Sequence, residues 1–346
     1  MKMLTCRKLR PIKRTLLYLQ VLLLIGTTVH AVNDSNEELR GATFTEPTKI
    51  FEMDTDWLKK PITYDASIEN ADLVITLGQH LYPIAEPIIK KYAKEHGLKI
   101  FINEGTCGIS AGMLSRKAAD IGGYCCSPGE TDRLPGLKFH SVGIAALALF
   151  VNHSNPIDNV SIEQARQIFS GEISRWSEIK IASGEKGSNR RIQPVARLHC
   201  KLRPGHWRLL LANEDLFSPS IQEVGAIQDM IEQVSRNHRA IGYETMTSIH
   251  RYYPHEKELK VKALKINGYA HNESSDLVNT NYPLYRVISL TTWEGKNVQN
   301  PHAQKLVDYL IKEVDHFDSK LGIVPVSQIR KAGWKFYGNE LNGEPE

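Results

Sequence analysis

Short apolar runs alternate with an amphipathic helix, and this order constrains the fold more than any other feature of the sequence. Asp72–Leu77 and Lys99–Asn103 are apolar runs of strand type, and a helical pattern over Ile84–His96 lies between them and stops at Gly97. A third short run follows at Ala119–Gly123. Strand, helix and strand in this order imply a parallel sheet. The turns after these strands are therefore expected at one edge of that sheet.

Cysteine is concentrated in these turns. The stretch from Asn103 to Pro128 has the pattern turn, helix, strand, turn, with Cys107 in one turn and Cys125 and Cys126 in the other. Cys200 follows another predicted strand, later in the chain. Helix N-termini with small residues commonly bind anions through unpaired N–H groups. Thiols in the same place are less usual and point to a different kind of site.

The first thirty-one residues have the pattern of an export signal. Six basic residues precede the apolar segment Leu16–Val29, which is too short to span a bilayer comfortably. Val29-His30-Ala31 fits a small-residue cleavage site. The sequence therefore predicts that residues 1–31 are a signal peptide, and a single membrane anchor is the alternative. No stable membrane span is expected after cleavage.

Removing this leader changes the charge of the chain. The full sequence has 43 basic and 39 acidic residues, and the leader holds six basic residues and no acidic ones. The remainder has 37 basic residues against 39 acidic ones, a net charge of −2. No basic patch therefore argues for nucleic acid as a partner. The protein is expected in the periplasm or outside the cell, where disulfides are permitted.

The length and the order of the apolar runs predict two lobes. About 315 residues after the leader usually divide in this way. Residues 32–70 are polar and are expected to form a surface arm. The uncharged run Ser141–Val151 is expected to be one buried strand that crosses between lobes. We therefore predict lobe I from residues 71–145 and 265–346 and lobe II from residues 146–264.

Three helix starts are predicted from capping signals. Ser161 and Gln164 form a capping box, and Gly171 closes the helix that they open. Ser218-Pro219 is expected to cap the next helix, with proline at its first position. Asn300-Pro301 is expected to do the same for the last long helix.

The sequence resembles the periplasmic phosphate-binding proteins of ABC importers. The stretches that carry the resemblance occur in order between Asp72 and Val326 and are NPIDNVSIEQARQIFSGEISRWSEI (Asn155 to Ile179), DIGGYCCSP (Asp120 to Pro128), AIGY (Ala240 to Tyr243), YPLYR (Tyr282 to Arg286) and LGIVPV (Leu321 to Val326). The resemblance implies an α/β fold of the type II periplasmic-binding-protein kind, with two lobes that close on a small molecule or ion. It also implies binding without enzymatic turnover, an ABC permease as partner and a monomer.

The four loops that hold the ligand in that family differ here. The family uses hydroxyl groups and backbone N–H groups, whereas this chain places cysteine and histidine among them. The ligand-site residues that the resemblance implies are Gln79, His80, Thr106, Cys107, Gly108, Cys125, Cys126, Ser127, Arg197, His199 and Cys200. Arg197 matches the anion-binding arginine of the family and is expected to face the cleft.

Several explanations of the cysteines stay open. One is a soft metal or an iron–sulfur centre held by Cys107, Cys125, Cys126 and Cys200, with His80, His199 and His206 in reserve. A second is a structural disulfide, for instance Cys107 with Cys125 or with Cys200, beside an oxyanion held by Arg197, Thr106, Ser110 and Ser127. Further alternatives are reactive or incidental thiols, a His199–Cys200 nucleophile, and a redox or metal-dependent protein on the same scaffold. Glu104 and Glu244 are acidic residues that could line the cleft.

Overall fold

A computed structural model describes the chain from residue 44 to residue 346, apart from residues 180–186, 200–202, 204, 254–259 and 318. The described residues belong to one compact unit, Leu39–Glu346. The predicted signal peptide, residues 1–31, and the predicted ligand Cys200 lie outside the described residues.

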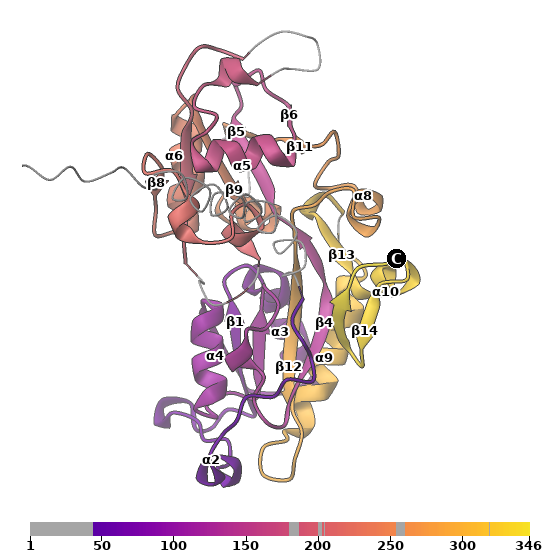
Figure 1. Cartoon of the computed structure of the whole chain (residues 1–346). Coiled ribbons are helices and arrows are strands. Elements are labelled where there is room, and N and C mark those ends of the chain that lie inside the picture. The colour runs from indigo at the N-terminus through magenta and orange to yellow at the C-terminus, as the bar shows by residue number, and fades with distance from the viewer. Residues whose placement is uncertain (1–43, 180–186, 200–202, 204, 254–259, 318) are drawn as a thin grey trace, which may run out of the picture. The chain divides into compact units, whose positions relative to one another are not determined.

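Two sheets organise this unit (Figure 1). The first has the strand order β13-β4-β12-β3-β1-β2, and its strands are β1 (Leu73–Gly78), β2 (Ile100–Gly105), β3 (Ile121–Tyr124), β4 (Leu137–Ala146), β12 (Tyr285–Trp293) and β13 (Ile323–Pro325). The second has the order β10-β5-β9-β7-β8, and its strands are β5 (Ala148–Asn152), β7 (Gln193–Ala196), β8 (Gln222–Glu223), β9 (Ala240–Glu244) and β10 (Val261–Ala263). The predicted division into lobes at residues 145 and 265 remains a prediction.

The predicted parallel strands are present in the first sheet. β1 pairs in parallel with both β2 and β3, so the three strands end at the same edge. Helix α3 (Tyr82–His96) joins β1 to β2 and ends at Gly97, whose φ of 65° suits glycine. Helix α4 (Cys107–Ser115) begins two residues before the expected Ile109, because the Thr106 hydroxyl caps it by accepting the Ile109 N–H at 3.2 Å.

Capping signals place two of the three helices correctly. Helix α5 (Ile162–Ser170) has the expected capping box at its start and Gly171 at its end, and α9 (Pro301–Val314) is capped by Asn300. The start predicted at Ser218-Pro219 is wrong, because α6 (Ile227–Arg236) begins eight residues later. The Ser218 hydroxyl instead accepts the Ser220 N–H at 3.2 Å, which forms a local turn.

The uncharged run Ser141–Val151 forms two strands instead of the one expected. β4 ends at Ala146 in the first sheet, and β5 begins at Ala148 in the second. The Leu147 N–H between them donates to the Leu284 carbonyl at 2.8 Å, outside both ladders. The run therefore passes from one sheet to the other, as predicted, but with a break at Leu147.

The segment before β1 is more than a surface arm. Trp57 and Ile62, from the predicted arm of residues 32–70, pack against the cluster of buried residues that includes the cysteines. Lys117 is buried, and its ammonium donates to the carbonyls of Trp57 and Lys60, both at 2.7 Å. These contacts satisfy the buried charge and attach the described part of the arm to the first sheet.

The buried apolar side chains of the described residues form separate clusters. Trp176 and Leu310 lie in different clusters of buried apolar residues. The other helices and strands are α2 (Thr55–Lys59), α7 (Met246–Tyr252), α8 (Ser274–Val278), α10 (Val326–Lys331), β6 (Asn159–Val160), β11 (Lys265–Ile266), β14 (Lys335–Tyr337) and β15 (Glu340–Gly343). Within the described ranges, no helix is both long and apolar enough to cross a membrane.

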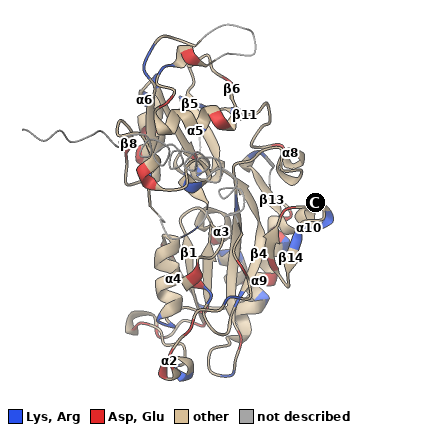
Figure 2. Ribbon diagram, viewed as in Figure 1, with Lys and Arg blue, Asp and Glu red and all other residues tan. Residues whose placement is uncertain are grey.

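Basic and acidic residues are interspersed along the described chain (Figure 2). Several form ion pairs between elements far apart in the sequence, such as Lys91 with Glu313 at 3.0 Å. Exposed pairs of this kind contribute little to stability. The charges that matter for a site are therefore the buried ones.

Candidate functional site

Three thiol groups meet where β2 and β3 end. Cys107 begins α4 directly after β2, and Cys125 and Cys126 follow β3. The Sγ atoms of Cys107 and Cys125 lie 3.2 Å apart, and all three sulfur atoms lie within 4.8 Å of one another. All three side chains are buried. β1 ends beside them at Gly78, where a Cβ atom would lie 3.2 Å from the Cys107 sulfur, so only glycine leaves this space open. We call these three residues the thiol cluster.

No disulfide joins the three cysteines of the thiol cluster to one another. The distance of 3.2 Å between the sulfur atoms of Cys107 and Cys125 exceeds the roughly 2.05 Å of a disulfide bond. Hydrogen bonds with Cys107 and Cys125, together with burial, raise the pKa of the Cys126 thiol well above its ordinary value. Cys126 therefore keeps its proton at neutral pH, and a metal ion must displace that proton to bind.

A buried ion pair lies at the ends of two strands of the second sheet. Arg197 directly follows β7, and Glu244 is the last residue of β9. The Arg197 Nη1 atom lies 3.5 Å from Glu244 Oε2, and His80 Nε2 lies 2.7 Å from Glu244 Oε1. Burial alone would raise the pKa of Glu244, but the charges of His80, Arg197 and Arg286 outweigh it and lower the pKa to about 2. Glu244 is therefore ionised at neutral pH.

These contacts connect the two sheets. His80 and Gln79 follow β1 of the first sheet, whereas Arg197 and Glu244 belong to the second. Besides its contact with Glu244, Arg197 donates from Nη2 to Gln79 Oε1 at 3.2 Å. The structure thus brings together Gln79, His80 and Arg197, which the sequence resemblance assigned to the ligand site from two separate loops.

Arg286 is a site residue that the sequence analysis missed. It lies in β12, is fully buried, and places Nη1 3.4 Å from His80 Nδ1. Burial lowers the pKa of Arg286, but the neighbouring sulfur atoms of Cys125 and Cys126 and the Glu244 carboxylate raise it above its ordinary value. A signal was present in the sequence, because a single arginine within an apolar strand is rarely buried without a partner.

Two further imidazoles lie beside His80. The His206 ring centre is 5.2 Å from that of His80 and 4.7 Å from that of His199. Burial lowers the pKa of His206 well below its ordinary value, and burial and the Arg197 charge lower the pKa of His199 to about 4. Both rings are therefore neutral at pH 7 and keep a lone pair on one nitrogen.

Several other predicted residues have structural roles. Thr106 caps α4, and Gly108 lies in the first turn of that helix. The Ser110 hydroxyl lies 3.4 Å from that of Thr76, and Ser127 is buried. Glu104 forms an ion pair with Arg251, with atoms 2.5 and 2.8 Å apart. Cys200, the fourth predicted metal ligand, lies outside the described residues.

A second buried ion pair was also missed. Asp132 accepts from Arg203 Nε at 2.7 Å and from Arg203 Nη2 at 2.5 Å. Asp132 precedes β4 of the first sheet. Arg203 lies between β7 of the second sheet and the short helix η4 (His206–Leu209). This bidentate pair holds the segment that carries His206 against the first sheet.

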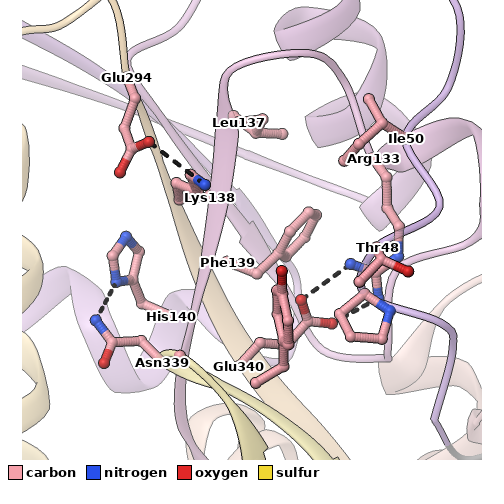
Figure 3. Close-up of a pocket in the computed structure, with 13 residues that line it drawn as sticks. Thr48, Ile50, Arg133, Leu137, Lys138, Phe139, His140, Glu294, Asn339 and Glu340 are labelled. Carbon is pink, nitrogen blue, oxygen red and sulfur yellow. Dashed lines mark hydrogen bonds and ion pairs between the residues drawn. The ribbon is translucent and has the colours of Figure 1, made fainter.

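Figure 3 shows a separate pocket beside β4 and the β14–β15 hairpin. Its charged groups pair with one another: Arg133 with Glu340 at 2.6 Å and Lys138 with Glu294 at 3.4 Å. No cysteine lines this pocket within the described part of the chain. Its polar groups thus hold the hairpin in place, and the thiol cluster with its neighbours is the better candidate site.

Comparison with known sequences identifies a family of domains. The sequence model of the PBP superfamily domain matches residues 69–314. Phosphate-binding protein PstS 2 from two strains of Streptococcus agalactiae, serotypes V and III, is 25% identical over 119 residues. This alignment covers 34% of the present chain and 40% of the length of each relative.

Solved structures show the same fold. A putative phosphate ABC transporter substrate-binding protein from Clostridium perfringens, solved with bound phosphate, matches with a TM-score of 0.60 and 18% identity over 73% of this chain and 98% of that one. An ABC-type phosphate transport receptor from Vibrio cholerae matches with a TM-score of 0.55 and 18% identity over 73% of this chain and 99% of that one. The predicted α/β fold of the periplasmic-binding-protein type is confirmed.

Proposed function

This chain belongs to the PBP superfamily of substrate-binding domains, and on that premise we propose that it captures a thiophilic metal ion in the thiol cluster. One observation carries the proposal: three buried sulfur atoms from two strand ends lie within 4.8 Å of one another, with no disulfide between them. Packing alone does not require this arrangement, since apolar side chains of similar size would fill the same space.

The donor set selects the class of ion. Thiolates are soft ligands that suit Cu(I) and Zn²⁺, with metal–sulfur distances of about 2.3 Å for zinc. Three sulfur atoms can surround a monovalent ion completely or fill three of the four positions around Zn²⁺. An iron–sulfur centre usually takes four thiolates, and Cys200 would have to supply the fourth.

Buried positive charge supports thiolate formation. Each thiol that loses its proton adds a negative charge to the interior, which is costly unless a cation lies nearby. Arg286 is fully buried and lies close enough to the thiol cluster for the sulfur atoms to raise its pKa. Its guanidinium therefore offsets part of the cost of the thiolates, in addition to the charge of the metal itself.

The transport role rests on the fold and on the leader. The thiol cluster lies on the first sheet, and the Arg197–Glu244 pair, which touches it through His80, lies on the second. Closure of two lobes around an ion would join these groups, and opening would separate them again. We propose that the protein is exported to the periplasm or beyond and delivers its ion to an ABC permease or another envelope protein.

Phosphate is the second candidate ligand. The relatives named above bind or transport phosphate according to their names, and two buried guanidinium groups, Arg197 and Arg286, favour an anion. Glu244 weakens this candidate, because its carboxylate already neutralises one of the two cations. The candidate also leaves the thiol cluster without a role.

Anaerobic titration with Cu(I) and Zn²⁺, beside calorimetry with phosphate, separates the two candidates. We expect one thiophilic ion per chain. Its affinity should fall at least about tenfold in Cys107→Ser and Cys126→Ser, because each substitution removes a sulfur atom that binds the ion directly. Met113→Leu is the matched control, because it removes a sulfur atom from the same helix outside the thiol cluster. Phosphate binding with no metal binding, or equal metal affinity in the cysteine variants, would refute the proposal.

A further inference from the structure

Buried polar atoms without an aligned hydrogen-bond partner gather on the far side of His80 from the thiol cluster. Among the described residues they include His80 Nε2, both ring nitrogens of His206, Glu244 Oε2 and Arg197 Nη1. The short contact between His80 Nε2 and Glu244 Oε1 is therefore close without being a well-aligned hydrogen bond. Buried polar groups are normally satisfied, so such a group of atoms calls for a missing partner.

His206 gives the clearest signal. Its side chain is 2% exposed, and neither ring nitrogen has a hydrogen-bond partner among the described residues. Its backbone has a φ of 58°, directly after Gly205 with a φ of 99°. A left-handed conformation is costly for a residue with a side chain and persists only where the surrounding structure holds it in place. The chain thus holds a neutral imidazole at a fixed place with nothing described to bind.

His80 faces two groups at once. Its Nδ1 atom lies 3.5 Å from the Cys125 sulfur, and its Nε2 atom points to Glu244. One ligand atom from each of His80, His206 and Glu244 lies within 4.8 Å of the others. We call these three residues the imidazole–carboxylate group.

We propose that the imidazole–carboxylate group is a second cation site for a divalent ion of the Zn²⁺ class, next to the thiol cluster. Two imidazoles and one carboxylate are a known ligand set for zinc, with metal–ligand distances of about 2.0–2.2 Å and one position left open. The contact of 2.7 Å between His80 and Glu244 must widen by roughly 0.6–0.9 Å to admit the ion between the two atoms. The ion would bind the lone pair of His80 Nε2, so that nitrogen carries no proton when the site is filled.

The neighbouring charges decide when this site can fill, and in this respect the inference rests on the proposed function. Without thiolates, the Glu244 carboxylate faces two guanidinium groups, Arg197 and Arg286, and the surplus positive charge opposes a cation. When three thiolates hold a monovalent ion, the thiolates, the ion, Glu244 and the two arginines together carry one net negative charge. This charge favours a divalent ion at the second site. We therefore expect the thiol cluster to fill first and the imidazole–carboxylate group second.

Silver and cobalt ions test this order on the full exported chain. Ag(I) serves as a stable monovalent probe of the thiol cluster, and Co²⁺ serves as a coloured substitute for Zn²⁺. We expect one Ag(I) per chain, followed by one Co²⁺ whose visible bands show nitrogen and oxygen ligands. His206→Gln should bind Ag(I) like the unmodified protein and bind Co²⁺ at least about tenfold more weakly. His153→Gln, at an exposed position, is the matched control and should bind both ions normally.

The two steps fail separately. If Ag(I) does not bind, or binds equally to Cys107→Ser, the proposed function is wrong. If Ag(I) binds but Co²⁺ binds equally to His206→Gln and to the unmodified protein, only the second site is wrong. Should His206→Gln fail to fold, nitrogen-15 spectra of the unmodified Ag(I)-loaded protein replace it. Zn²⁺ must then shift the ring nitrogens of His80 and His206, and unshifted signals would overturn the inference.

Discussion

Substitution of Glu244 by glutamine tests whether this carboxylate is the buried counter-ion of the site. Glu244 is fully buried, with His80 at 2.7 Å and Arg197 at 3.5 Å. Its pKa falls from an ordinary 4.5 to about 2 in the folded protein. A shift of that size corresponds to about 3 kcal/mol of stability at neutral pH, at 1.36 kcal/mol per pKa unit. Loss of one partner from a buried ion pair typically costs about 3–5 kcal/mol, in agreement.

The lowered pKa of Glu244 determines how its contribution to stability changes with pH. Because the folded-state pKa is lower than the unfolded one, the stabilisation is fully present above about pH 4.5 and is lost as the pH falls towards 2. Urea unfolding should therefore show Glu244→Gln to be less stable by about 3 kcal/mol at pH 7 and by only about 1 kcal/mol at pH 3. Glu52→Gln, at an exposed position, should change stability by less than about 0.5 kcal/mol. A Glu244→Gln difference that stays constant between pH 7 and pH 3 would refute the reasoning.

Three further predictions concern neighbouring groups. Asp132→Asn should lower the free energy of unfolding by about 3–5 kcal/mol in urea titrations, because it leaves the buried Arg203 without its carboxylate, and a loss below about 1 kcal/mol would contradict this. Gly78→Ala should weaken metal binding in competition with a chelator, because its Cβ atom would lie 3.2 Å from the Cys107 sulfur; unchanged affinity would show that the sulfur atoms can move aside. Metal affinity should rise with pH, since binding displaces the proton of Cys126, whose pKa is raised; a flat profile between pH 6 and pH 9 would argue against thiolate ligands.

Much of the scaffold could be predicted from local patterns. The strand–helix–strand order around α3 identified the parallel pairing of β1 with β2, which places Cys107 at the edge of the sheet. The parallel pairing of β1 with β3 places Cys125 at the same edge. The capping box at Ser161 fixed the start of α5, because both of its hydrogen bonds lie within four residues. The same approach failed at Ser218-Pro219, where the serine hydroxyl served a turn instead of a helix.

The partners across the two sheets could not be predicted in the same way. Glu244 and His80 are far apart in the sequence, and only the tertiary fold determines that they meet at 2.7 Å. The role of Arg286 could not be predicted for the same reason, because its sequence is that of an ordinary buried strand with one charged residue. The resemblance to phosphate-binding proteins predicted which loops hold the ligand, but it could not predict the chemistry of loops that contain cysteine and histidine.

X-ray absorption spectroscopy on the protein, purified without a metal-chelating tag, tests the central claim most directly. The proposed site predicts about one thiophilic metal ion per chain, with sulfur neighbours at about 2.3 Å in the case of zinc. The sulfur signal should weaken in Cys107→Ser and persist in Met113→Leu. A metal-free protein that carries phosphate, or a bound metal with only oxygen and nitrogen neighbours, would contradict the account.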